Sequence, residues 1–170
     1  MLIDFAAPGP TWSSIDDSVM GGVSSSGMMI ENGVGVFSGT VSLANNGGFA
    51  SVRTLPASYG LAAHDSLVVR VRGDGKRYKV RLRTTDSFDG VSYQASIDPP
   101  AGRWTEIEVP FTDFVTVWRG LRVADHEALD PARIRTFGLL ISDKQVGPFR
   151  LEIAWIAATS AEASGDSDAP

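Results

Sequence analysis

Short runs of alternating apolar and polar residues, separated by turn residues, dominate this sequence. The segments "SLVVRVR" (66–72), "YKVRLR" (78–83) and "VSYQASI" (91–97) alternate with a period of two, which is typical of half-buried β-strands. The 18 glycines and 9 prolines punctuate such runs. Only "DHEALDPARIR" (125–135) resembles a short helical turn. Roughly eight to ten strands at roughly 10–20-residue spacing, without intervening helices, predict an all-β sandwich or barrel.

The length favours a single domain. We predict that the β-domain spans residues 2–157. The remaining segment, "ATSAEASGDSDAP" (158–170), is small, polar and acidic and has little to bury, so we predict a flexible tail.

Composition excludes several classes of function. The net charge of −5 argues against a general nucleic-acid binder. The chain has no cysteine, which excludes disulfides, thiolate metal sites and cysteine nucleophiles. The N-terminal "MLIDFAAPGPTW" has neither the features of a signal peptide nor those of a transit peptide, and no apolar run approaches the roughly 20 residues of a membrane span. These features predict a cytoplasmic protein without a membrane span.

Motifs for catalysis and cofactor binding are absent from the sequence. The two histidines, His64 and His126, are isolated, and no G-x-S-x-G occurs. The glycines of "GVGVFSG" (33–39) have the wrong spacing for a dinucleotide site and lead into a strand. The Gly-rich "DDSVMGGVSSSG" (16–27) lacks the lysine of a phosphate loop, and we interpret it as a tight corner in which Asp17, like Asn46 in a second Gly-rich corner, bonds backbone N–H groups. We therefore predict no cofactor.

Carboxylates leave two alternatives open. Asp17, Glu106 or Glu108 could supply the two carboxylates of a glycosidase, but cross-strand pairing of the two glutamates with basic residues is the simpler interpretation. Calcium could use oxygen ligands from aspartates, although no EF-hand spacing occurs; the candidates are Asp16, Asp17, Asp86 and Asp89. The prediction is a non-enzymatic protein without a metal site.

The segment "SLVVRVRGDGKRYKVRLRT" (66–84) reads as a β-hairpin with an Asp-Gly turn. One face would carry apolar residues, and the opposite face would carry Arg70, Arg72, Lys79, Arg81 and Arg83. The next strand adds Gln94. Such a face is typical either of a binding surface or of an ordinary solvated sheet with Arg–Glu ladders.

The four tryptophans have different expected places. Trp155 alternates with Leu151 and Ile153, which predicts a core position. Trp12 is expected to be structural, whereas Trp118 could be a surface anchor or a loop plug, and Trp104 or Trp118 could stack on a sugar.

Several segments in order, covering nearly the whole domain, resemble the complex I intermediate-associated protein 30 family. They are "W-x4-DSVMGGVSS" (12–25), "FSGTVSLANNGGFASVRT" (37–54), "RVRGDGKRYKVRLR" (70–83), "VSYQASI" (91–97), "W-x-E-I-x-V-PF-x-DF" (104–114), "WRG" (118–120) and "GLLISDKQVGPFRLEI" (138–153).

The resemblance implies a single jelly-roll β-sandwich of the galactose-binding-like type, the architecture of many carbohydrate-binding modules. It also implies a role like that of the eukaryotic members, which help to assemble respiratory complex I, and it carries no established catalytic residues. We therefore predict a binding or assembly module, chaperone-like, whose partner is a protein such as a complex I subunit or assembly intermediate. The alternative is a carbohydrate or other small ligand bound by the concave face of a sheet. The predicted binding residues are Arg53, Arg70, Arg72, Lys79, Arg81, Gln94 and Trp118.

Overall fold

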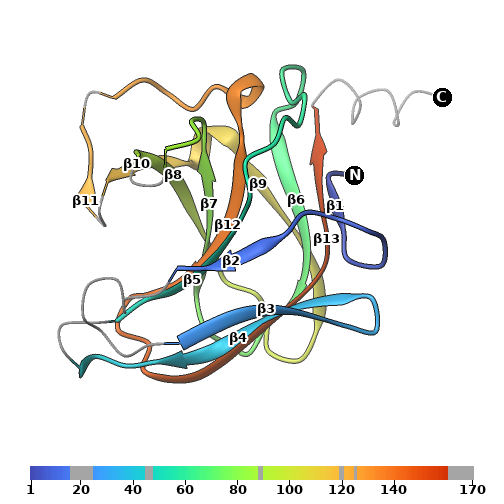
Figure 1. Cartoon of the computed structure of the whole chain (residues 1–170), viewed down its shortest axis with the longest axis vertical. Helices are drawn as coiled ribbons and strands as arrows, with labels where there is room; N and C mark the ends of the chain where they lie inside the picture. Colours follow the sequence, from blue (N-terminus) through green and yellow to red (C-terminus); the bar gives the residue numbers. More distant parts are fainter. Residues whose placement is uncertain (16–24, 45–47, 88–89, 119–120, 125, 161–170) are drawn as a thin grey trace.

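The computed structural model describes residues 1–15, 25–44, 48–87, 90–118, 121–124 and 126–160. Within these residues the chain forms strands and short turns, arranged as two sheets packed face to face (Figure 1). The all-β prediction is confirmed, and the arrangement is a jelly-roll sandwich. Asp16, Asp17, Asn46 and Asp89, to which sequence analysis gave structural or calcium-binding roles, lie outside the described residues.

Sheet A has the strand order β3-β4-β13-β6-β9, and β1 pairs with β13. All of its pairs are antiparallel. Its strands are β1 (Ile3–Asp4), β3 (Ser25–Glu31), β4 (Val34–Val41), β6 (Ser66–Arg72), β9 (Trp104–Pro110) and β13 (Gly147–Thr159).

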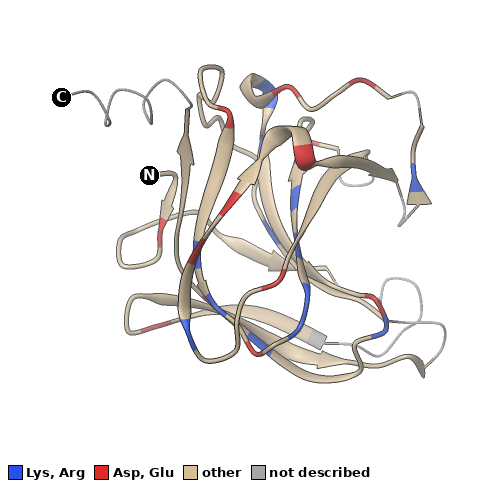
Figure 2. Cartoon of the chain, turned by 180° about the vertical axis from the view of Figure 1, so that it is seen from behind, with Lys and Arg blue, Asp and Glu red and all other residues tan. Residues whose placement is uncertain are grey.

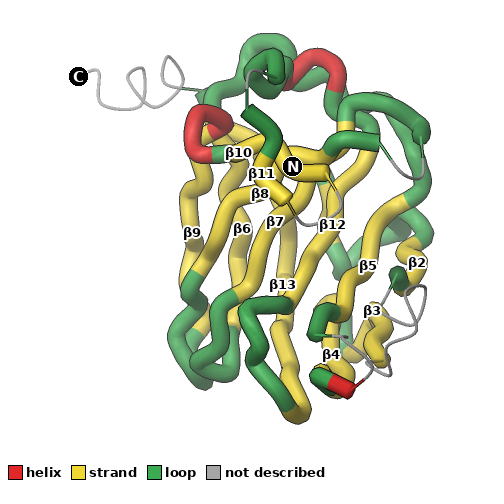
Figure 3. The backbone as a smooth tube through the Cα atoms, turned by 90° about the vertical axis from the view of Figure 1, so that its left-hand side faces the viewer, coloured by secondary structure: helices red, strands yellow, loops and turns green. Residues whose placement is uncertain are grey.

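Sheet B has the order β11-β10-β8-β7-β12-β5-β2 and is also antiparallel. Figure 3 shows β8, β7, β12 and β5 running side by side. The strands are β2 (Trp12–Ser14), β5 (Ala50–Thr54), β7 (Tyr78–Arg83), β8 (Ser92–Ile97), β10 (Val115–Trp118), β11 (Leu121–Arg122) and β12 (Thr136–Ile141).

The core lies between the two sheets. Sheet A contributes Val69, Val71 and Phe37, and sheet B contributes Tyr78 and Leu82, each at most 2% exposed. The rings of Phe37 and Tyr78 meet edge to face across the sandwich with centroids 6.1 Å apart. Because every second residue of each strand points inward, the alternation in the sequence is sufficient to form this core.

The hairpin predicted over residues 66–84 does not form. β6 pairs with β13 and β9 in sheet A, whereas β7 pairs with β8 and β12 in sheet B. Residues 73–77 therefore carry the chain from one sheet to the other. The prediction was wrong because two strands that face one core from opposite sides have the same alternation as a hairpin.

The sheet crossing is held by Asp74. Its carboxylate accepts hydrogen bonds from the backbone N–H of Lys76 at 3.1 Å, the hydroxyl of Tyr78 at 3.0 Å and the backbone N–H of Arg150 at 2.8 Å. Burial, followed by the charge and hydrogen bond of Asp74, raises the pKa of Tyr78. This side chain thus ties the crossing to β7 and to β13.

Trp155 is half-buried and is not among the core residues, contrary to the prediction. A β-bulge between Ile153 and Trp155 shifts the register, so Trp155 stands opposite Arg70 on the outer face of sheet A. The inserted residue inverts the alternation, and Ile156 returns to the core. Trp12 is structural, since its ring stacks on Phe5 with centroids 6.0 Å apart.

Phe111–Asp113 and Pro131–Arg133 each form a single 3₁₀ turn. The second lies within the predicted helical segment 125–135. Asp130 caps it, because its side chain accepts a hydrogen bond from the backbone N–H of Ala132. β13 continues to Thr159, two residues beyond the predicted end of the domain, and Ala158 pairs with Leu67.

Candidate functional site

The predicted binding residues are divided between opposite faces of the molecule. Because β6 and β7 belong to different sheets, Arg70 and Arg72 lie on the outer face of sheet A, and Lys79 and Arg81 lie on the outer face of sheet B. Basic positions are accordingly spread over both sheets (Figure 2). The single Arg-rich face predicted from the hairpin is wrong.

On sheet A, Arg70 and Arg72 are already engaged. Their guanidinium carbons lie 5.7 and 5.2 Å from the ring centroid of Trp104, within the range of cation–π contacts. Arg72 also forms a salt bridge with Glu152, to which its Nε donates a hydrogen bond at 2.7 Å. Trp104 is thus covered by arginines rather than presented as a platform for a sugar.

The two glutamates considered as catalytic carboxylates also lie on this outer face. Glu106 stands opposite Arg70, and their charged groups are 4.0 Å apart. Glu108 stands opposite Val68. Both are exposed and line none of the described pockets, so the cross-strand interpretation fits Glu106.

Trp118 belongs to neither outer face. Val117 precedes Trp118 in β10 and stands opposite Ser92 on the outer side of sheet B. Because successive side chains of a strand point to opposite faces, Trp118 points to the inner side. It is 44% exposed at the edge of the sheet and pairs with Leu121 in β11, which is 73% exposed.

Sheet B brings the remaining predicted residues together. We define the arginine face by Arg53 of β5, Lys79, Arg81 and Arg83 of β7, and Gln94 of β8, which share the outer side of the sheet. The pairing Arg53–Gly138–Arg81–Gln94 forms one row across four adjacent strands. Arg83 was not among the predicted binding residues, although its alternation with Arg81 was visible in the sequence.

Lys79, Arg81 and Arg83 of the arginine face are held by different partners. Arg81 Nη2 donates to Gln94 Oε1 at 3.1 Å, and Arg83 Nη1 donates to the carbonyl oxygen of Gly90 at 2.7 Å. Lys79 Nζ lies 3.2 Å from an oxygen of Asp143 and donates to the Ser142 hydroxyl at 3.0 Å. Lys79 is therefore neutralised within the chain.

The arginines of this face disfavour one another's charge. Burial, and then the charges of Arg83 and Arg53, lower the pKa of Arg81 to about 10. Burial, and then the charge of Arg83, lower the pKa of Arg53 to about 10. At neutral pH the groups are still protonated, so the face holds like charges that are partly removed from water.

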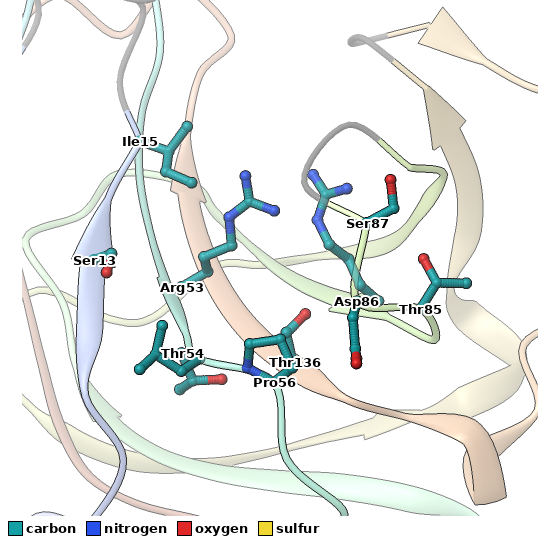
Figure 4. A pocket seen from close by; sticks show the side chains of 11 residues that line it. Ser13, Ile15, Arg53, Thr54, Pro56, Thr85, Asp86, Ser87 and Thr136 are labelled. Carbon is teal, nitrogen blue, oxygen red and sulfur yellow. The ribbon is translucent and has the colours of Figure 1, made fainter.

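A pocket of about 180 Å³ opens beside these arginines. Figure 4 shows Arg53 extending between Ile15 and Ser87. Hydroxyl groups, two arginines and one carboxylate supply the polar side chains of its lining. The lining residues are Ser13, Ile15, Arg53, Thr54, Leu55, Pro56, Arg83, Thr85, Asp86, Ser87 and Thr136. Sequence reasoning missed this pocket, because its walls come from segments far apart in the chain.

Asp86 is the acidic group among the residues that line this pocket. Arg135 binds both of its oxygens, at 2.8 and 3.3 Å, and this hydrogen bonding lowers the pKa of Asp86. Asp86 was a calcium candidate, but among the described residues no group of three potential metal ligands occurs. Within the same residues no helix is long and apolar enough to cross a bilayer.

Two further pockets lie among the described residues. One is lined by His64, Phe111 and Phe114 at the end of the sandwich, and the Nδ1 of His64 is buried without a described partner. The other is lined by Arg77, Lys79, Asp98 and Asp143, which are already joined in ion pairs.

Solved structures share this fold. The family 11 carbohydrate-binding module of a cellulosomal cellulase from Clostridium thermocellum matches with a TM-score of 0.72 and 16% identity, over 95% of this chain and 94% of that one. A family 29 carbohydrate-binding module matches with a TM-score of 0.55 and 10% identity, over 94% and 89%. At such identities the likeness establishes the jelly-roll fold alone.

Curated relatives are similar in sequence. The mitochondrial complex I intermediate-associated protein 30 of Drosophila melanogaster is 28% identical over 92% of this chain and 61% of its own length. The Mus musculus protein of the same name is 35% identical over 58% and 31%. The chain therefore spans less than two thirds of these relatives.

The names of these relatives also correct one expectation. We predicted a cytoplasmic protein because the N-terminal sequence lacks targeting features, but the relatives are named as mitochondrial proteins, which contradicts that prediction. The family model of complex I intermediate-associated protein 30 matches residues 3–153. The chain therefore belongs to the complex I intermediate-associated protein 30 family.

Proposed function

We propose that this chain is a non-enzymatic binding module that holds a protein partner during assembly of a respiratory complex, and that the arginine face is its binding surface. Family membership supports the assembly role, and the partner class follows from the names of the relatives. The observation that carries the choice of surface is the row Arg53–Gly138–Arg81–Gln94, in which guanidinium groups from separate strands converge beside a pocket. Arginine is a residue type that frequently anchors protein interfaces.

Affinity capture tests this proposal. The tagged chain is used to capture complex I subunits from solubilised mitochondria, and each recovered subunit is quantified by mass spectrometry. We expect the charge reversals Arg53→Glu and Arg81→Glu together to abolish subunit recovery. The matched control reverses Arg70 and Arg72 on the outer face of sheet A, and recovery should persist. Equal recovery by both double variants would show that the arginine face is not the binding surface.

Carbohydrate binding is the second candidate, supported by the shared fold with carbohydrate-binding modules. Such modules bind sugars with aromatic rings that stack on the pyranose, in addition to polar groups. On the outer side of β5, β7, β8 and β12, all of whose residues are described, the registers place no aromatic side chain. We therefore rank this candidate second. Calorimetric titration with a mixed-linked glucan tests it, and heat of binding that disappears in Arg53→Glu would favour it.

A further inference from the structure

The pocket lined by His64, which we call the His64 pocket, is separate from the arginine face. Its volume is about 410 Å³, within the roughly 300–1,000 Å³ that is typical of small-molecule sites. Its walls come from residues 64–66 at the start of β6, residues 110–116 from the end of β9 to β10, and residues 128–131 ahead of β12. No residue of the arginine face is among the described residues that line it.

Hydrogen bonds within the chain fix the three walls of the His64 pocket. The first two walls are joined where the backbone N–H of Phe111 donates to the carbonyl oxygen of Asp65 at 2.9 Å. At the third wall, the hydroxyl of the buried Tyr93 donates to the carbonyl oxygen of Glu127 at 3.3 Å, and Asp130 caps the 3₁₀ turn that follows. The cavity is therefore largely preformed, as is usual for sites that bind small ligands.

Two phenylalanines give the His64 pocket an aromatic lining. Phe111 and Phe114 are 6% and 8% exposed, and their rings are tilted by 41° with centroids 6.3 Å apart. The rings of Pro110 and Pro131 add apolar surface on two of the walls. Because aromatic rings pack favourably in tilted and offset pairs, a ligand with an aromatic ring fits this lining.

His64 supplies a polar group beside these rings. Its Nδ1 is buried, and its side chain forms no hydrogen bond with another described residue. In a neutral imidazole one nitrogen carries the proton, and a buried N–H without an acceptor is rarer than a buried acceptor without a donor. The proton therefore belongs on Nε2. Since Nδ1 is inaccessible, a ligand in the pocket meets the other edge of the ring, where Nε2 offers an N–H donor.

Carboxylates at the His64 pocket select against an anionic ligand. Asp65 lines the pocket, Asp113 follows the lining residue Thr112, and Asp130 precedes the lining residue Pro131. No lysine or arginine is among the described residues of the lining. Like charges repel, so the acceptor for His64 is expected to be a neutral oxygen rather than a carboxylate or phosphate. The threonine hydroxyls of the lining can in turn accept the proton of a ligand hydroxyl.

We propose that the His64 pocket binds a small, neutral phenolic compound. The aromatic ring of the compound packs on Phe111 and Phe114, and its hydroxyl oxygen accepts a hydrogen bond from Nε2 of His64. The volume of about 410 Å³ leaves room for a substituent on the phenol ring. This site shares no residue with the arginine face, so the inference goes beyond the proposed function and does not depend on it.

An NMR titration of the full chain with p-cresol tests the proposal. The backbone amide signals are followed at about pH 8, where an ordinary imidazole is neutral, and toluene is the matched probe without a hydroxyl. We expect p-cresol to bind about three- to tenfold more tightly than toluene, since the two differ by one hydrogen bond. His64→Phe keeps a ring of similar shape but removes the donor, so it should abolish this difference while changing the affinity for toluene less than about twofold.

A second pair of variants tests the location of the site. Ala128 and Ala132 are both exposed, but only Ala128 is among the residues that line the pocket. Ala128→Trp should fill the pocket and weaken both probes by about tenfold or more, whereas Ala132→Trp should change either affinity less than about twofold. Signal shifts caused by p-cresol in the parent protein should cluster at residues 64–66, 110–116 and 128–131, which locates the compound without any variant.

The outcomes of these titrations are distinct. Tighter binding of p-cresol than of toluene, lost in His64→Phe and accompanied by shifts around the pocket, supports the phenol site. Equal binding of the two probes, no binding of p-cresol up to about 10 mM, or shifts that lie elsewhere in the chain would overturn it. Equal effects of Ala128→Trp and Ala132→Trp would also overturn it, and melting temperatures verify that each variant is folded. Failure of phenol binding would leave the capture of complex I subunits by the arginine face unaffected.

Discussion

Arg81 donates a hydrogen bond from Nη2 to Oε1 of Gln94 at 3.1 Å, joining the neighbouring strands β7 and β8. This single neutral acceptor is a weak counterpart for a guanidinium that is half-buried and lies near two other cations. A partly buried cation with so weak a counterpart is typical of a functional site, where stability is given up for binding.

Replacing Arg81 with Met should therefore stabilise the protein. Burial and neighbouring cations lower the pKa of Arg81 to about 10 in the folded state, below its ordinary value of 12.5. The folded state thus holds this proton less tightly than the unfolded chain does. The protonated Arg81 side chain therefore lowers the free energy of unfolding, and this loss is fully present below about pH 10. We expect the free energy of unfolding at pH 7 to rise by on the order of 1 kcal/mol, measured by urea denaturation.

The pH dependence provides the check on this prediction. As pH rises through about 10, Arg81 loses its proton in the folded parent protein, and the advantage of Arg81→Met should shrink. Arg122→Met at an exposed position of β11 is the control and should change stability by less than about 0.5 kcal/mol at either pH. A loss of stability in Arg81→Met that does not vary with pH would contradict the prediction.

Asp74 offers a test of the sheet crossing. Asp74→Ala removes the acceptor for the Tyr78 hydroxyl and for the backbone N–H groups of Lys76 and Arg150. Since Tyr78 is fully buried, its hydroxyl would lose its partner, and we expect a destabilisation of about 2–4 kcal/mol in chemical denaturation. Asp98→Ala, which breaks only the exposed ion pair with Arg77, should cost less than about 1 kcal/mol. Similar losses in both variants would refute the role of Asp74.

Sequence patterns predicted the strands but not how they are distributed between the sheets. Alternation in residues 66–72 and 78–83 identifies an inward side, and that side is the same for a hairpin and for two strands facing across a core. The Asp-Gly turn favoured the hairpin, whereas Asp74 in fact bonds partners as distant as Arg150. Trp155 was misplaced for a related reason, because a single bulge inverts the alternation without a sequence signal of its own.

The candidate site was predictable to a similar extent. Lys79, Arg81 and Gln94 share a face because they lie on neighbouring strands at matching alternation, and this was visible in the sequence. Arg53 joins them only through β12, which comes from the last third of the chain. No local pattern specifies that β12 inserts between β5 and β7, so the pocket could not be predicted.

Gly35 supports the packing of the N-terminal segment. A Cβ at this position would lie 2.5 Å from the ring of Phe5, which is 4% exposed and stacks on Trp12. We expect Gly35→Ala to displace Phe5 and lower the free energy of unfolding by about 1–3 kcal/mol, since overpacking forces neighbouring groups to move. Gly9→Ala is the control, because its Cβ would lie 4.0 Å from the carbonyl oxygen of Ala7, an ordinary van der Waals contact. An unchanged melting temperature in Gly35→Ala would show that Phe5 is not fixed there.

Glu152 organises the charges on the outer face of sheet A. One oxygen of its carboxylate binds Arg72, and the other lies 3.0 Å from the Nε of Arg150. The Glu152 side chain is only 12% exposed. Arg150 continues the network to Glu31 at 3.2 Å. Glu152→Gln would leave two guanidinium groups without their shared anion, and we expect a loss of about 1–3 kcal/mol in the free energy of unfolding.

Glu106→Gln is the matched control for this network. Glu106 is 54% exposed and lies 4.0 Å from Arg70, so its removal should cost less than about 0.5 kcal/mol. Raising the salt concentration from about 0.05 M to about 0.5 M screens exposed pairs more than buried ones, so the effect of Glu152→Gln should persist while that of Glu106→Gln vanishes. If both substitutions respond equally to salt, Glu152 behaves as an ordinary surface charge and the network contributes little. If only Glu152→Gln remains destabilising, this ion network stabilises sheet A, and its arginines are committed to structure and not to a ligand.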